Sequence, residues 1–445
     1  MRVSRYSIYE VILFHFFVLV YYLTFSHKDM WGSTIALLGI TIVLILLEYL
    51  RTKLFVSPLL LWYVFWLGVI SVGRMDLNLY PFYQTWSREL LNVVILNTVI
   101  FFWFFWAGEF LNLKVSSMRK DRLPLMNRGD LLAGITLCIL IVSATAFFIN
   151  VIYTGYIPQL TGDANSYRQS FVVTPFYRIV NLFRFVFAIV PFAFIYTRQR
   201  IFKIGIVLFS LILMGMEMLS GWRSYTLQAM VLLLTSLFLV LDVGNRERKR
   251  SAKKTLPIIA AAVSAALVFI GYVAVTRDGV IGAFKEKFNY LLYTLDMYIA
   301  PNFLNFQSGM NSIEPLGYPL YTTEAFWGLV TSWDELPPYP PIDQAIGAFN
   351  VSTYLLQPYV DLGIPGTLIW SGVAGITAGS IFRKCRERLN SGSVILLGIV
   401  NFSVLVMHNN FFFRASSTVL WIAAGAAIDL FILMSGIRRQ RVMKG

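Results

Sequence analysis

The residues of this chain best suited to chemistry are arginines that stand apart from its other basic residues. Six of them lie at or just inside the predicted outer boundary of apolar segments: Arg168, Arg178, Arg184, Arg223, Arg277 and Arg414. A guanidinium group binds phosphate through paired, planar hydrogen bonds. Several arginines that converge from different helices would therefore form a receptor for a pyrophosphate. The alternative is that each arginine caps a helix or pairs with a nearby carboxylate.

A reaction at such a receptor also needs a group that accepts a proton. The sequence offers few candidates for a general base, namely His408, Asp278, Asp334, Glu335 and Asp343. Glu217 lies about one turn before Arg223, and we expect both residues on the same helix. Pairing with an arginine and service in a proton relay are the two interpretations of Glu217.

Other chemistries have no residues to support them. The sequence contains no Walker loop, GxGxxG, HExxH, CxxC or GxSxG motif, which argues against nucleotide-driven transport and metal hydrolysis. Its two cysteines, Cys138 and Cys385, lie in an apolar and a basic segment and suggest neither a disulfide framework nor a metal cluster. We therefore expect no metal and no cofactor.

The elements that must position these residues are membrane helices. The chain is 57% hydrophobic and only 13% charged, whereas about 25% of the residues of an ordinary soluble domain are charged. Twelve apolar runs are each about long enough to cross a bilayer; they are 8–25, 31–49, 54–73, 90–111, 131–152, 178–196, 204–220, 225–243, 256–275, 364–382, 394–411 and 415–435. The sequence predicts an all-α polytopic integral membrane protein with about 12 transmembrane helices, forming a single transmembrane domain over residues 1–445. The N-terminal run is long and lacks a cleavage site, so we expect it to be a retained helix.

The basic residues predict the orientation of these helices. Of the 37 lysines and arginines, 26 lie in alternate connections and at the two termini, so both termini are predicted to be cytoplasmic. The net charge of +14 then reflects this orientation and indicates no nucleic-acid partner.

Two predicted outer segments are longer than a connection requires. The first covers 153–177, and the second is a large extracytoplasmic loop over 276–363 that holds nine carboxylates and three basic residues. Loops of this size are usually functional or disordered, and the aromatic content of the second argues against disorder. The apolar spacing of 288–306 suits an interfacial or re-entrant helix.

These segments carry a resemblance to a known family. NSYRQSF followed by PFYR, SGWRS between two helices, TRDG at the start of an acidic loop, and FNVSTYLLQPYVDLGIPGTLIW occur in that order. This arrangement, over about 150–430, resembles the Wzy-type oligosaccharide repeat unit polymerases. The fold implied is similar to GT-C-like glycosyltransferases, which use lipid-linked donors.

The resemblance implies a function, partners and a site. Such enzymes polymerise undecaprenyl-pyrophosphate-linked oligosaccharide units for O-antigen, enterobacterial common antigen or exopolysaccharide, by metal-independent, inverting transfer of the growing glycan onto a new unit. The expected location is the bacterial cytoplasmic (inner) membrane with the site facing outward, and the expected partners are membrane lipids, a flippase and a chain-length regulator. Arg168, Arg223, Arg277 and Arg414 match positions where the family tends to place arginine, and Asn165 and Tyr167 neighbour them as glycan-binding candidates.

Two other functions fit the same sequence. An O-antigen ligase has the same architecture and donor but a different acceptor. A flippase for the same lipid-linked sugar would also need many helices, although the large outer loop and the scarcity of charge deep in the apolar runs favour it less.

Overall fold

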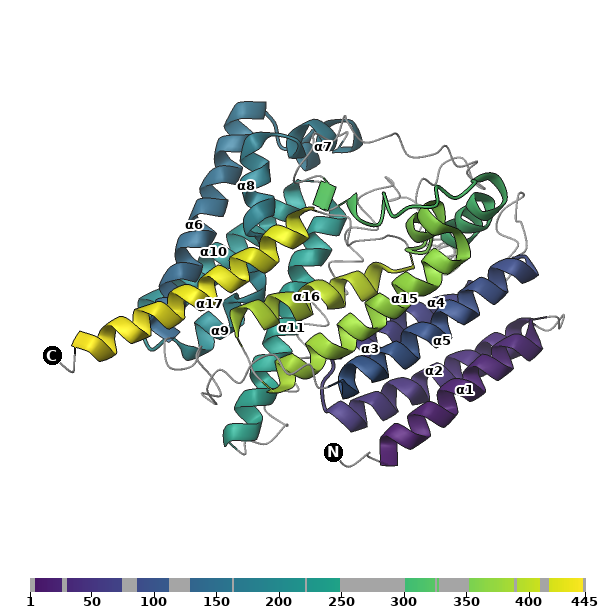
Figure 1. Cartoon of the computed structure of the whole chain (residues 1–445). Coiled ribbons are helices and arrows are strands. Elements are labelled where there is room, and N and C mark those ends of the chain that lie inside the picture. The colour runs from purple at the N-terminus through teal and green to yellow at the C-terminus, as the bar shows by residue number, and fades with distance from the viewer. Residues whose placement is uncertain are drawn as a thin grey trace, which may run out of the picture. The chain divides into compact units, whose positions relative to one another are not determined.

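The computed structural model describes most of the chain, and its described part is helical without a strand (Figure 1). The residues outside this description are 1–4, 26–29, 74–85, 112–128, 162–163, 221, 249–300, 325, 328–351, 388–389, 409–415 and 443–445. The chain divides into two compact units, and each is described by itself. Unit 1 comprises Met1–Lys114, Ile281–Arg383 and Ser403–Ser416, and unit 2 comprises Val115–Val280, Lys384–Phe402 and Ser417–Gly445.

Several helices are long and apolar enough to cross a bilayer. The described residues contain seven of them, or up to eight if one bent pair forms a single span. The seven are Arg5–Thr24, Gly32–Thr52, Arg88–Phe110, Gly129–Thr154, Arg200–Leu219, Ser224–Leu241 and Leu356–Glu387. This pattern is that of a polytopic membrane protein.

The other predicted spans differ from these seven. Run 54–73 forms an apolar helix over Pro58–Val72, and the last two runs contain apolar helical stretches over Ser391–Val406 and Ser417–Ile432; all three stretches are shorter than 18 residues, although the last belongs to a helix that covers Ser416–Val442. Run 178–196 is broken rather than continuous, and run 256–275 lies outside the described residues.

Unit 1 is built around the N-terminal helices, which Figure 1 shows in purple and dark blue. They are α1 (Arg5–Thr24), α2 (Met30–Thr52), the continuous stretch α3 (Pro58–Trp62), η1 (Tyr63–Leu67) and α4 (Gly68–Val72), and α5 (Arg88–Phe110). The middle piece, η1, is a π-helical turn. Stacked rings form the core between them, as Phe14 of α1 lies 3.8 Å from Phe102 of α5 between ring centroids.

Helix α15 (Leu356–Glu387) packs directly against α5. Its Gly379 faces the α5 backbone so closely that a Cβ atom there would lie 2.1 Å from the carbonyl oxygen of Phe105. Residues 301–312, which belong to the predicted large loop, are helical and largely buried in unit 1. There Phe303 lies against Trp66 and Trp86, with centroid distances of 5.7 and 4.7 Å.

Unit 2 contains the helices of the central part of the chain. They are α6 (Gly129–Thr154), η3 (Pro158–Leu160), α7 (Ala164–Val172), α8 (Pro175–Phe183), η4 (Arg184–Ala188), α9 (Val190–Tyr196), α10 (Arg200–Leu219) and α11 (Arg223–Arg248), with most of α16 (Ser391–Val406) and α17 (Ser416–Val442).

Two local sequence features explain the broken segment. Thr174 caps α8 by accepting a hydrogen bond from the Tyr177 backbone at 3.1 Å, and Pro175 occupies the first turn, where its missing N–H costs nothing. Further on, Pro191 cannot donate to the carbonyl of residue 187, so residues 184–188 tighten into the 3-10 turn η4 before α9 begins.

Candidate functional site

The break in run 178–196 places a charged side chain inside unit 2. Arg184, the first residue of η4, is 2% exposed and forms a two-pronged ion pair with the fully buried Glu217 of α10. Its Nε donates to Oε1 at 2.8 Å and its Nη2 to Oε2 at 3.1 Å. Nη1 donates to Gln228 of α11 at 3.1 Å, and the Tyr177 hydroxyl donates to Glu217 Oε2 at 2.8 Å. The charges balance, and all three guanidinium nitrogens have an acceptor.

This geometry settles the role of Glu217 and corrects its predicted placement. Glu217 pairs with an arginine, as one of the two interpretations held. It does not share a helix with Arg223, because α10 ends at Leu219 and α11 begins at Arg223. Arg184 donates to Glu217 and Gln228, so its role is structural. We therefore remove it from the arginines that could bind a ligand.

A column of two stacked aromatic rings with an arginine at each end extends from this ion pair. The Arg184 guanidinium lies 4.1 Å from the ring centroid of Tyr225, which stacks on Trp222 at 5.4 Å. The Arg168 guanidinium lies 5.2 Å from the Trp222 ring, and the indole N–H donates to the Arg168 carbonyl at 3.3 Å. Cations are attracted to the faces of such rings. The column therefore holds helix α7, which carries Arg168, against the start of α11.

Arg168 and Arg223 are thereby brought to the same part of unit 2. Arg223 directly follows Trp222 and is the first residue of α11; its side chain lies outside the description. The first N–H groups of a 26-residue helix lack intrahelical acceptors, and the helix start favours negative charge. Arg178 is exposed on α8, and among the described side chains no contact joins it to Arg168.

The glycan-binding candidates lie on α7 as well. Tyr167 is 43% exposed, and its ring is 5.0 Å from Tyr156 between centroids. The Tyr156 hydroxyl bonds to Ser170 at 2.6 Å, which fixes its ring beside α7. Asn165 is part of α7, although its side chain is not among those described.

His408 is the single base candidate within the described residues. It follows α16 and lies in unit 1, next to Met407, whose carbonyl accepts a hydrogen bond from the Tyr354 backbone at 2.8 Å. Burial lowers the pKa of His408 to about 4, so its imidazole is neutral at neutral pH. Asp278, Asp334, Glu335 and Asp343 lie outside the described residues, as do Arg277 and Arg414.

The DLGIPG segment is a structural device of α15. Asp361 is buried and accepts hydrogen bonds from the backbones of Tyr321 and Thr322 at 2.9 and 2.8 Å, and from the Thr322 hydroxyl at 2.6 Å. Gly363 has φ 68°, which only glycine adopts without strain, and it interrupts the helix two residues before Pro365. Asp361, which the sequence analysis counted in the large loop, therefore belongs to α15 and holds the loop residues Tyr321 and Thr322 against this helix.

The interruption frees two backbone carbonyls, and the loop supplies their donors. Pro365 has no N–H to give to the carbonyl of Asp361, four residues earlier. Instead, Gly317 donates to the Asp361 carbonyl at 2.8 Å and Leu316 to the Val360 carbonyl at 2.9 Å. A segment outside the helix completes its hydrogen bonding.

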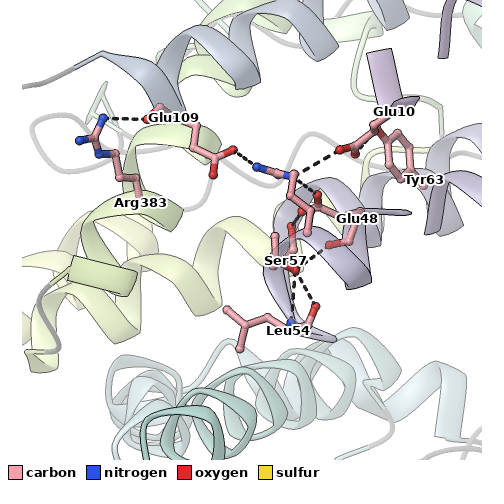
Figure 2. A network of polar contacts seen from close by, with 9 residues as sticks. Glu10, Glu48, Leu54, Ser57, Tyr63, Glu109 and Arg383 are labelled. Carbon is pink, nitrogen blue, oxygen red and sulfur yellow. Dashed lines mark hydrogen bonds and ion pairs between the residues drawn. The ribbon is translucent and has the colours of Figure 1, made fainter. Parts of the chain in front are cut away.

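A second buried arginine, in unit 1, escaped the sequence analysis. Arg51, at the end of α2, lies among Glu10 of α1, Glu48 of α2 and Glu109 of α5, as Figure 2 shows for the three carboxylates. Its Nε donates to Glu48 at 2.6 Å and lies 3.3 Å from Glu10, while its Nη1 donates to Glu109 at 2.7 Å. Each acid is a lone charge within an apolar run, and this was the one signal the sequence offered.

Neutral and aromatic groups complete this cluster. Tyr63, which opens the π-helical turn η1, donates to Glu10 Oε1 at 2.7 Å, and Ser57 donates to Glu48 Oε1. The Arg51 guanidinium lies 4.4 Å from the Trp106 ring. Arg383 donates to the carbonyl oxygens of Glu109 and Phe110 at 2.9 and 3.1 Å, next to the cluster in Figure 2.

The comparisons with known proteins give no further guide to this site. No protein-family model, no curated protein and no solved structure matches the chain.

Proposed function

We propose that this membrane protein is a glycosyltransferase that polymerises oligosaccharide repeat units linked to undecaprenyl pyrophosphate, at the outer face of a bacterial cytoplasmic membrane. The observation that carries this proposal is the contact between Arg168 and Trp222, which brings α7 to the start of α11 where Arg223 stands. Arg168 then lies close to the start of α11, whose first residue is Arg223, and arginines beside a helix start suit a pyrophosphate.

The chemistry requires stabilisation of a charged leaving group. The acceptor hydroxyl oxygen attacks the anomeric carbon of the donor, the bond to the pyrophosphate oxygen breaks, and the hydroxyl proton passes to a base. Negative charge grows on the pyrophosphate, where preorganised arginines lower the barrier without a metal. His408, Asp278, Asp334 and Asp343 remain the candidates for the base.

Aromatic side chains near Arg168 suit the sugar part of the substrate. Tyr156 and Tyr167 form a ring pair beside α7, and Tyr167 is exposed. Flat ring faces with hydroxyl groups can pack on sugar rings and bond to their hydroxyls, so we assign the repeat unit to this side of α7, the helix to which Asn165 also belongs.

Substitution of the two arginines tests the proposal. We expect Arg168→Ala and Arg223→Ala each to lower polymer formation on the order of 100-fold or more, since one lost charge-stabilising donor has about that effect. The measurements are the length of the surface glycan in cells and the product formed from purified lipid-linked units. Arg198 is exposed between α9 and α10, where its backbone N–H donates to Asp130. Arg198→Ala is the matched control and should retain wild-type activity.

The outcomes separate the related functions. Surface glycan of a single repeat in a deletion strain indicates a polymerase, whereas loss of all surface polymer indicates a ligase. Lipid-linked units trapped at the inner face indicate a flippase. Near-normal chain length in both arginine variants would remove the pyrophosphate site from the proposal, and loss of purified activity in a chelator would contradict the metal-free step.

A further inference from the structure

The Arg51 cluster of unit 1 contains three glutamates and one arginine. Glu10 and Glu48 are fully buried and Glu109 is 3% exposed, all beside one guanidinium. Glu48 and Glu10 both approach the same nitrogen, Nε, at 2.6 and 3.3 Å. Nε carries one hydrogen, which points to Glu48. Two carboxylates held this close in a buried place repel each other strongly if both are ionised.

One oxygen of the pair has no hydrogen-bond donor. Glu10 Oε1 accepts from Tyr63, but Glu10 Oε2, the oxygen 3.3 Å from Arg51 Nε, is buried and has no hydrogen-bond partner within the described part of the chain. Both oxygens of Glu48 have donors, Arg51 and Ser57. A buried, ionised carboxylate oxygen without a donor is costly, and a proton on that oxygen removes its negative charge and turns it into a donor.

We propose that this cluster is a proton-binding site in which one proton resides on the Glu10 and Glu48 pair, on Glu10 Oε2 in the arrangement of Figure 2. The titratable and charged groups around Glu10 are Glu48 and Arg51 of α2, Tyr63 of η1 and Glu109 of α5. Arg383 of α15 lies beyond Glu109 and bonds to its carbonyl.

The geometry selects a proton over a metal ion. Within the described ranges, no three His, Cys, Asp or Glu side chains are placed to hold a metal. A proton needs only two oxygens. It also has a short route, because Arg51 and Glu109 are next to the last residues of α2 and α5, beside the 53–57 connection. The charge pattern of the sequence predicts that this end of the helices is cytoplasmic.

The bound proton would hold α1 in place. Glu10 is the residue through which α1 reaches both Arg51 and the π-helical turn at Tyr63. With the proton, Glu10 is neutral and its contacts are favourable. Without it, a second buried negative charge faces Glu48 across one N–H, and the packing of α1 against α2 weakens. This inference does not depend on the proposed glycosyl transfer.

Infrared spectroscopy of the purified full-length protein in lipid nanodiscs tests the proposal. At neutral pH we expect the carbonyl band of a protonated carboxyl group, which shifts in D2O and disappears in Glu10→Gln. Glu89→Gln, at an exposed position of α5, is the matched control and should keep the band. Absence of the band from the wild-type protein overturns the proposal, and so does its persistence in both Glu10→Gln and Glu48→Gln.

Thermal unfolding as a function of pH supplies a second readout. The unfolded chain, whose glutamates ionise near about pH 4.3, has released the proton that the folded protein still holds at neutral pH. Stability therefore falls as the pH rises from mildly acidic to mildly alkaline, by a few degrees in melting temperature. Glu10→Gln keeps the neutral shape and should show a flat profile. A Glu10→Gln protein that fails to accumulate in the membrane would contradict the proposal, because it would show that an ionised Glu10 is required.

Discussion

Arg51 and Arg184 are both buried, both contact glutamate and both lie over an aromatic ring, yet they differ in the number of acids around them. Arg184 has one glutamate, which it binds with two nitrogens, and its third nitrogen binds Gln228. Arg51 has three glutamates, and its Nη2 is without an acceptor among the described residues. A buried pair with equal positive and negative charge needs no further partner, whereas a buried cluster with excess negative charge can bind a further cation such as a proton. Burial of an arginine alone therefore says little about its role.

The largest expected effect comes from breaking the balanced pair. Glu217→Ala leaves Arg184 charged and unpaired in the core, which costs about 3–5 kcal/mol. We expect a large loss of protein from the membrane fraction and a lower melting temperature for what remains. The double variant Arg184→Met with Glu217→Leu removes both charges and should recover most of the lost stability. A smaller loss remains, because Tyr177 and Gln228 no longer have their hydrogen-bond partners. Equal instability of the single and double variants would contradict this account of the pair.

An intermediate effect is expected from the unbalanced cluster. Arg51→Gln removes the one cation, but its glutamates can take up protons, so the loss at neutral pH is about 1–3 kcal/mol. The loss should grow as the pH rises, which melting temperatures at several pH values would reveal. A loss independent of pH would mean that the glutamates do not change protonation, and would remove the difference between the two arginines.

The smallest effect concerns the end of the column that extends from Arg184. Trp222→Leu removes the ring beneath Arg168 and the donor to its carbonyl, each worth about 0.5–1.5 kcal/mol. We expect faster amide hydrogen exchange in α7 and little change in α10. Trp222→Phe keeps a ring, so its exchange rate in α7 should lie between those of the wild-type protein and Trp222→Leu. Unchanged exchange in α7 would show that other contacts hold this helix.

The sequence predicted an all-helical protein with several membrane-spanning helices, because long apolar runs have few alternatives in lipid; the count of twelve stays a prediction, since the described residues contain seven or up to eight such helices. It missed the break at Arg184, since the effect of Pro191 appears four residues earlier, inside an otherwise continuous run. It also placed Glu217 and Arg223 on one helix, although the apolar runs themselves end at 220 and resume at 225, close to where α10 ends and α11 begins.

The outer arginines were easier to single out from the sequence than the three glutamates around Arg51. Arg168 and Arg223 could be singled out as candidates because arginine is unusual on the predicted outer side; their role stays a prediction. Glu10, Glu48 and Glu109 are each a single acid in an apolar run, and nothing in their spacing says that three helices bring them together. Only the packing of α1, α2 and α5 reveals their common partner.

The kink of α15 has a consequence for how the protein is made. The carbonyls of Val360 and Asp361 receive their hydrogen bonds from Leu316 and Gly317, which are synthesised before them. A buried carbonyl without a donor is strongly disfavoured, so the first turns of α15 are complete only once this earlier segment has docked. We expect a variant that lacks this segment to lose those first turns.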